Sequence, residues 1–162
     1  MTTDSVPARL RFLARVARKE SRHLQETTER LFQSKEPLTG LEVQRWIADS
    51  LIAERMDAFV ARFSRLQDLL GDKLIPSLLE HLGESSGLAI DNLDKAERFG
   101  WIASSDEWVV YRKLRNQMIH EYIEDPAVLA DALDAGCGFV DALTTSAETL
   151  ASEVERRLGP VE

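Results

Sequence analysis

The fold is decided by the stretch Leu114–Tyr122, LRNQMIHEY, and by the helix that leads into it. Ser104 is followed three residues later by Glu107, the capping-box spacing that marks a helix start. On a wheel of about 100° per residue, a helix over residues 105–122 has one broad apolar arc. Such an arc should face a core or a partner. Its members are Trp108, Val110, Tyr111, Leu114, Met118, Ile119 and Tyr122.

Polar side chains interrupt this arc within about two helical turns. Arg115 falls inside the arc, where an unpaired guanidinium would be costly to bury. Asn116 and His120 are four residues apart and share the edge of the arc, while Tyr122 lies two turns from Arg115. This combination of an arginine, an amide, an imidazole and a phenol needs an explanation.

Three interpretations follow from the residue types. In the first, Arg115 pairs with a carboxylate of a neighbouring helix, and His120 and Tyr122 are partly buried packing residues. In the second, Arg115 holds a phosphate bidentately, His120 transfers protons near neutral pH, and Asn116 orients one of those protons. In the third, the helix is a self-association seam with these groups at its polar centre.

The pattern Arg115-x4-His120-x-Tyr122, with Asn116 after the arginine, resembles the R-x4-H-x-Y motif of HEPN-domain proteins. Among these it is most similar to the HepT toxin family, whose partners are minimal nucleotidyltransferase antitoxins. Residues 89–93 and 99–102 resemble the short helix and turn that precede the family's motif, and residues 123–126 resemble the entry to its final helix. The resemblance covers about residues 38–158.

The resemblance implies a metal-independent endoribonuclease that cleaves tRNA or mRNA at a composite site on a homodimer interface. His120 would be the acid/base, Arg115 would stabilise the scissile phosphate, and Asn116 would orient His120. Arg115 and His120 diverge by about 140° on one helix, and a two-fold dimer would bring two copies of each into one cleft. Tyr122 would be the residue that the nucleotidyltransferase antitoxin AMPylates, which silences the toxin.

A different class of function remains open. Some HEPN proteins are non-catalytic nucleotide-binding or scaffold subunits that act through helix-bundle dimerisation. A long basic first helix sets this chain apart from the shorter HepT proteins, and the acidity of the chain opposes RNA affinity.

No strand pattern or internal repeat is present, and the sequence reads as helix after helix. We predict helices at about 6–33, 39–70, 74–79, 89–99, 105–122 and 126–158, with Gly71 ending or bending the second. Short connections favour an all-α, antiparallel, up-and-down bundle of four to five helices, HEPN-like in form. It would be a single domain, with a basic helix in residues 1–35 packed on a bundle formed by residues 36–162.

Charge is unevenly distributed along the 162 residues. The net charge of −8 argues against a general nucleic-acid coat. Arg112 and Lys113 nevertheless form a weak candidate RNA-binding spot beside Arg115, and a local basic groove on an acidic body is possible. For the first helix we favour a solvated basic face; its cations are Arg9, Arg11, Arg15, Arg18, Lys19 and Arg22.

The remaining composition places the chain in the cytoplasm. Cys137 is the only cysteine, which excludes an internal disulfide and fits a reducing compartment. We expect no membrane span, because no apolar run approaches about 20 residues, and no secretory signal. The histidines and acidic residues lack metal-ligand spacing, so we expect neither a metal nor a cofactor.

Overall fold

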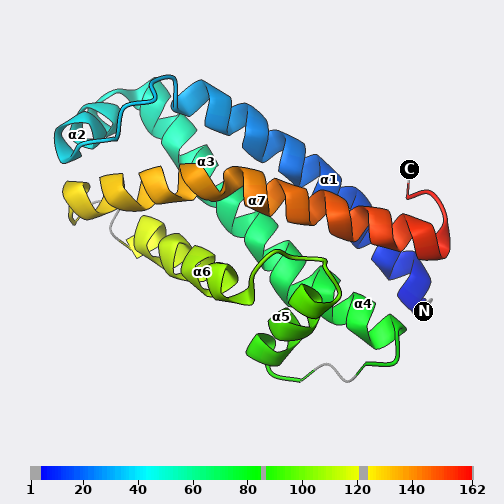
Figure 1. Ribbon diagram of the computed structural model, residues 1–162. Coiled ribbons are helices and arrows are strands. Elements are labelled where there is room, and N and C mark those ends of the chain that lie inside the picture. The colour runs from blue at the N-terminus through cyan, green and yellow to red at the C-terminus, as the bar shows by residue number, and fades with distance from the viewer. Residues whose placement is uncertain (1–4, 85–86, 121–123, 162) are drawn as a thin grey trace.

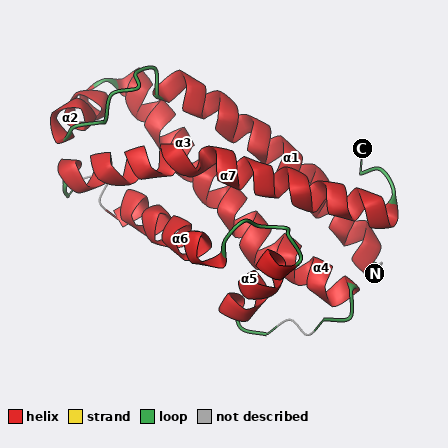
Figure 2. Ribbon diagram, in the orientation of Figure 1, coloured by secondary structure: helices red, strands yellow, loops and turns green. Residues whose placement is uncertain are grey.

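The computed structural model describes residues 5–84, 87–120 and 124–161, and these residues contain helices but no strand (Figure 2). The prediction of an all-α bundle is therefore confirmed. In chain order the elements are α1 (Val6–Leu31), α2 (Gly40–Ala48), α3 (Ser50–Asp68), the π-helical turn η1 (Leu69–Leu74), α4 (Ile75–His81), α5 (Ala89–Arg98), α6 (Ser105–His120) and α7 (Pro126–Leu158).

The long helices α1, α3, α6 and α7 run alternately up and down (Figure 1). Helix α7 lies along α1 and α6, and α3 crosses behind it. The short α2 covers one end of the bundle and packs on α7, while α5 links α4 to α6 near the other end. The C-terminal end of α6 consequently lies at the same end of the bundle as α2.

Local sequence signals set several helix ends, as predicted. The hydroxyl of Thr39 accepts a hydrogen bond from Glu42 N (3.2 Å), and that of Ser104 accepts one from Glu107 N (3.2 Å). Asp125 Oδ1 accepts from Ala127 N (3.1 Å), one residue beyond the proline that begins α7. Gly100 follows α5 with φ of 77°, the left-handed conformation that commonly ends a helix.

The prediction of one helix over residues 39–70 is wrong, because Asp49 divides it. Asp49 adopts an extended conformation, and its N–H donates to Arg45 O (3.1 Å) at the end of α2. Its Oδ1 then accepts from Leu51 N (3.1 Å) and Ile52 N (3.4 Å) at the start of α3. One short polar side chain thus ends one helix and caps the next.

The prediction that Gly71 ends the second helix is wrong, because the helical backbone continues through it as η1 and into α4. A bend at Gly71 stays a prediction. A Cβ at this glycine would sit 2.8 Å from Trp108 Nε1, so the indole packs directly on the backbone of the turn. Trp108 is 2% exposed, and its Nε1 has no hydrogen-bond partner among the described residues. The π-helical turn and the absence of a side chain at Gly71 together leave room for the indole of Trp108 from α6.

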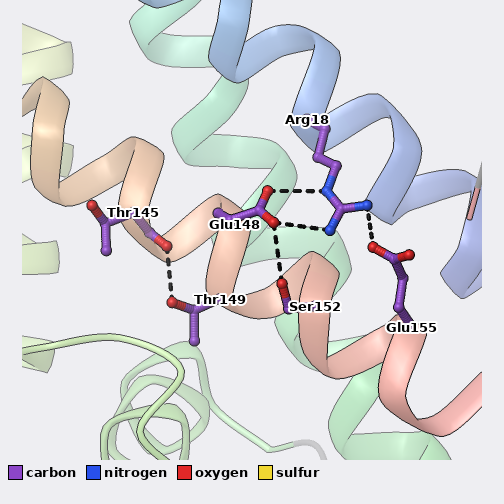
Figure 3. A network of polar contacts seen from close by, with 6 residues as sticks. All are labelled: Arg18, Thr145, Glu148, Thr149, Ser152 and Glu155. Atoms are coloured by element: carbon purple, nitrogen blue, oxygen red, sulfur yellow. Dashed lines mark hydrogen bonds and ion pairs between the residues drawn. The ribbon is translucent and has the colours of Figure 1, made fainter. Parts of the chain in front are cut away.

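Helix α1 shares one apolar core with the rest of the bundle, through buried residues such as Leu10, Leu13 and Leu24. Its basic residues also contact α7. Arg18 binds Glu148 bidentately (Nε–Oε2 3.0 Å, Nη2–Oε1 2.9 Å) and also pairs with Glu155 (Figure 3). Part of the basic face therefore neutralises the acidic last helix.

Two further arginines of α1 reach the segment after α7. Arg11 donates to the carbonyl of Leu158, and Arg15 Nη1 donates to the carbonyl of Val161 (3.1 Å). Val161 is buried against the core. In the described ranges, no helix has both the length and the apolar character needed to cross a bilayer.

Candidate functional site

Helix α6 presents its motif on the boundary between core and surface. Trp108, Tyr111, Leu114 and Met118 are buried, as the wheel predicts. Val110 and Ile119 were expected on the same apolar arc but are exposed. They occupy the two edges of the arc, about 80–100° from its buried centre, which explains the difference.

Arg115 forms an ion pair with the neighbouring helix. Its Nη2 lies 3.2 Å from Asp68 Oδ2 in the last turn of α3, and the two side chains are 30% and 37% exposed. Its Nη1 donates to Asn116 Oδ1 (3.1 Å). The Nε atom is buried and has no partner within the described ranges. The pair is the carboxylate contact that the first sequence interpretation expects.

A second ion pair lies one turn earlier on α6 and joins this helix to η1. Arg112 Nη2 lies 2.7 Å from Asp72 Oδ1, and both side chains are about half exposed. Lys113 is exposed on the adjacent surface. Two of the three cations in the predicted basic spot are thus paired with aspartates, so the local positive potential is weaker than the sequence suggests.

His120 is exposed and lines an open cavity between α3 and the end of α6. The cavity measures about 510 Å³. It is lined by Asp57, Val60, Ala61, Ser64, Met118, Ile119, His120 and Glu124. The imidazole is accessible to a ligand, and two carboxylates share its surroundings.

Arg115 and His120 lie along the contact between α3 and α6. Arg115 contacts Asp68, and His120 shares its cavity with Ser64 and Asp57 from preceding turns of α3. This order follows from the antiparallel packing of α3 and α6 (Figure 1). Asn116 contacts Arg115, and its role in orienting His120 stays a prediction. Tyr122 lies outside the described residues, so its modification also stays a prediction.

Cys137 and Tyr111 show no sign of activation. Burial raises the pKa of the Cys137 thiol, and Asp134 and Asp141 raise it further, which disfavours the nucleophilic thiolate. Burial also raises the pKa of Tyr111, whose hydroxyl donates to Glu107 Oε2 (3.2 Å). Across residues 5–84, 87–120 and 124–161, no group of three or more His, Cys, Asp or Glu side chains could hold a metal ion.

Sequence reasoning missed the contribution of α3 to this site. Asp57, Ala61, Ser64 and Asp68 recur at intervals of three and four residues, which places them on one face of a helix. That spacing was visible in the sequence. What it could not show was that this face would lie against the motif helix.

No protein-family model, curated protein or solved structure matches the chain. The fold and the site define the chain as an all-α bundle in which two arginines of α6 pair with aspartates beside an accessible imidazole.

Proposed function

We propose that the chain is a HepT-like toxin with an HEPN-like fold, a metal-independent endoribonuclease that acts as a cytoplasmic homodimer. The proposal rests on the motif resemblance together with one structural observation: His120 is solvent-accessible and lines a cavity of about 510 Å³ beside the helix that carries Arg115. A general acid or base must reach the proton it transfers, and an accessible imidazole meets that requirement.

The proposed reaction is transesterification within the RNA strand. One His120 removes the proton of a ribose 2′-OH, whose oxygen attacks the adjacent phosphorus. The bond to the 5′-oxygen breaks, and the second His120 of the dimer gives that oxygen a proton. The products are a 2′,3′-cyclic phosphate and a 5′-hydroxyl. Arg115 stabilises the charge that develops on the phosphorane oxygens.

Arg115 retains the capacity for this role despite its ion pair. The pair with Asp68 uses one of its terminal nitrogens at 3.2 Å, and both partners are partly exposed. Such a pair contributes only about 0–1 kcal/mol, so a phosphate in the cleft could displace the carboxylate. Asn116, held at 3.1 Å from the guanidinium, would then position Arg115 as well as His120.

The same proposal assigns a nucleotidyltransferase antitoxin as partner and Tyr122 as its target. An AMP group on this tyrosine would place a bulky anion where RNA phosphate must bind. Incubation with the cognate antitoxin and ATP should add the mass of one AMP to the peptide that contains Tyr122. Modification of another residue alone would contradict the assignment.

The Arg115–Asp68 pair favours a second candidate function, a non-catalytic HEPN nucleotide-binding or scaffold subunit. In this case the pair is structural and the exposed Ile119, next to His120, belongs to a dimer interface. A gene for a small nucleotidyltransferase beside this one favours the toxin, and its absence favours the scaffold.

The deciding experiment uses purified protein, EDTA and 5′-labelled tRNA or mRNA. The toxin proposal predicts cleavage that ends in a 2′,3′-cyclic phosphate and no cleavage of the same RNA carrying 2′-O-methyl groups. Intact RNA in every reaction, with a stable dimer in solution, would instead support the scaffold.

A further inference from the structure

Two adjoining clefts on the outer surface of α1 and α3 share the same two arginines. One cleft, of about 190 Å³, lies beside α2 and includes Trp46 and Gln33. The other, of about 230 Å³, continues along α3 and includes Arg62 and Thr27. Arg30 and Arg55 line both clefts, so the clefts adjoin at these two residues.

Arg30 and Arg55 differ from the arginines that link one helix of the bundle to another. Arg18, Arg112 and Arg115 each pair with a carboxylate of another helix. Arg30 and Arg55 are exposed and have no ion pair in the part of the chain that the structure describes. In a protein with a net charge of −8, two unpaired neighbouring arginines form a local centre of positive charge.

Arg62 adds a third cation whose position is fixed. Its Nη1 donates to the hydroxyl of Thr27 and to the carbonyl of His23 (3.1 Å) on α1. Both acceptors are uncharged, so neither supplies a negative charge that offsets the guanidinium. The acidic residues in the two clefts are Glu42 and Glu54. Glu42 belongs to the cap of α2, where Thr39 Oγ1 lies 3.4 Å from its Oε1.

Trp46 supplies an aromatic surface beside the arginines. Its ring packs edge-on against Phe32, with centroids 5.9 Å apart, and the side chain is only partly buried. The other two tryptophans, Trp101 and Trp108, are almost fully buried. An accessible aromatic ring next to unpaired arginines is the combination that binds the bases and backbone of single-stranded nucleic acid.

We propose that this double cleft binds the backbone of single-stranded RNA, with phosphates on Arg30, Arg55 and Arg62 and a base against Trp46. The inference rests on the proposed function, because it assigns the path by which the substrate reaches His120. On α3, Ala58 lines the arginine cleft and Ala61 lines the His120 cavity. The two sites therefore lie on adjoining faces of α3, and the strand crosses one helix width of roughly 10 Å.

The test is the salt dependence of RNA affinity, measured by fluorescence anisotropy with a labelled 2′-O-methyl oligouridine 12-mer that cannot be cleaved. For single strands the slope of log K against log salt is about −0.7 per neutralised phosphate. Three arginine contacts therefore predict a slope of about −2. The double substitution Arg30→Gln/Arg55→Gln should weaken binding and bring the slope to about −0.7.

The matched control is Arg9→Gln/Arg98→Gln, which removes the same charge from two exposed positions away from the double cleft. It should leave the slope close to that of wild type. Equal slopes for the two double variants would overturn the proposal, as would binding to phosphatidylserine vesicles without binding to the oligonucleotide.

Trp46 gives an independent readout of the same complex. The RNA should quench the fluorescence of wild type, and Trp46→Phe, which keeps an aromatic ring on Phe32, should abolish the quenching while the arginine-dependent slope persists. Quenching that persists in Trp46→Phe would contradict the placement of a base against Trp46. None of these measurements requires cleavage. RNA that binds here without being cut would contradict only the proposed nuclease activity. RNA that is cut without using these arginines would contradict only the proposed binding to the double cleft.

Discussion

The guanidinium of Arg115 lies 3.2 Å from the carboxylate of Asp68 and joins the motif helix α6 to the last turn of α3. An anion that binds Arg115 must therefore compete with an acid already in place. Both side chains are about one-third exposed, so the pair is not a buried one. The phosphate therefore competes with a carboxylate that is still partly solvated and only weakly held.

Asp68→Asn should increase RNA cleavage, because it removes the negative charge that competes with phosphate. The expected change is a several-fold rise in kcat/KM, with the free energy of unfolding lowered by no more than about 1 kcal/mol. Asp72→Asn, which disrupts the Arg112 pair one turn earlier on α6, is the control and should affect cleavage less. Loss of cleavage in Asp68→Asn at unchanged stability would show that the pair itself is required.

Arg18→Gln should reduce the free energy of unfolding by about 1 kcal/mol at pH 7, because Arg18 links α1 to Glu148 and Glu155 on α7. The hydrogen bond from Arg18 lowers the pKa of Glu148. This contribution is complete above the unfolded glutamate pKa of about 4.3 and is lost as pH falls through the lower folded value.

Urea unfolding at several pH values checks this dependence. The difference between wild type and Arg18→Gln should shrink steadily below about pH 4.3. A difference that stays constant down to pH 2.5 would show that packing of the arginine stem, rather than its ion pairs, accounts for the effect.

Gly71→Ala should destabilise the bundle by about 1–3 kcal/mol, because the added Cβ would sit 2.8 Å from Trp108 Nε1 in a tightly packed site. The change should also shift tryptophan fluorescence. Gly138→Ala on α7 meets nothing within 4 Å and should stabilise the protein by about 0.5–1 kcal/mol. Thermal unfolding of both variants is the measurement, and equal effects would contradict the close packing of Trp108.

Much of the fold was predictable because helix ends depend on local chemistry. Thr39, Ser104 and Asp125 cap helices through backbone groups two or three residues away, so short sequence patterns locate them. Asp49 was missed because the apolar periodicity continues across it. The π-helical turn η1 was missed because no local pattern marks it, and Trp108, which packs on Gly71, comes from a distant part of the chain.

The site was predictable only on α6. His120 and Arg115 were found because they stand close together in the sequence, whereas the partner Asp68 comes from another helix. Arg55 and Arg62 are seven residues apart, a spacing that places them on one helix face. Arg30 joins them only through the packing of α1 against α3, which no sequence pattern specifies.

Cys137 should react slowly with iodoacetamide at pH 8, because burial and nearby carboxylates raise the pKa of its thiol. Its rate should still be rising above pH 9, and unfolding in guanidinium should restore the rate of a free cysteine. A rate in the folded protein that matches free cysteine at pH 8 would contradict the half-buried position of this side chain.

The most direct test of the central claim is the single-turnover rate of RNA cleavage by His120→Ala. If His120 transfers protons, the rate should fall by about 10²–10⁴-fold, while the affinity for the uncleavable RNA and the thermal stability stay at wild-type values. Cleavage by His120→Ala at the wild-type rate would contradict proton transfer by His120 and leave the exposed imidazole without a catalytic role.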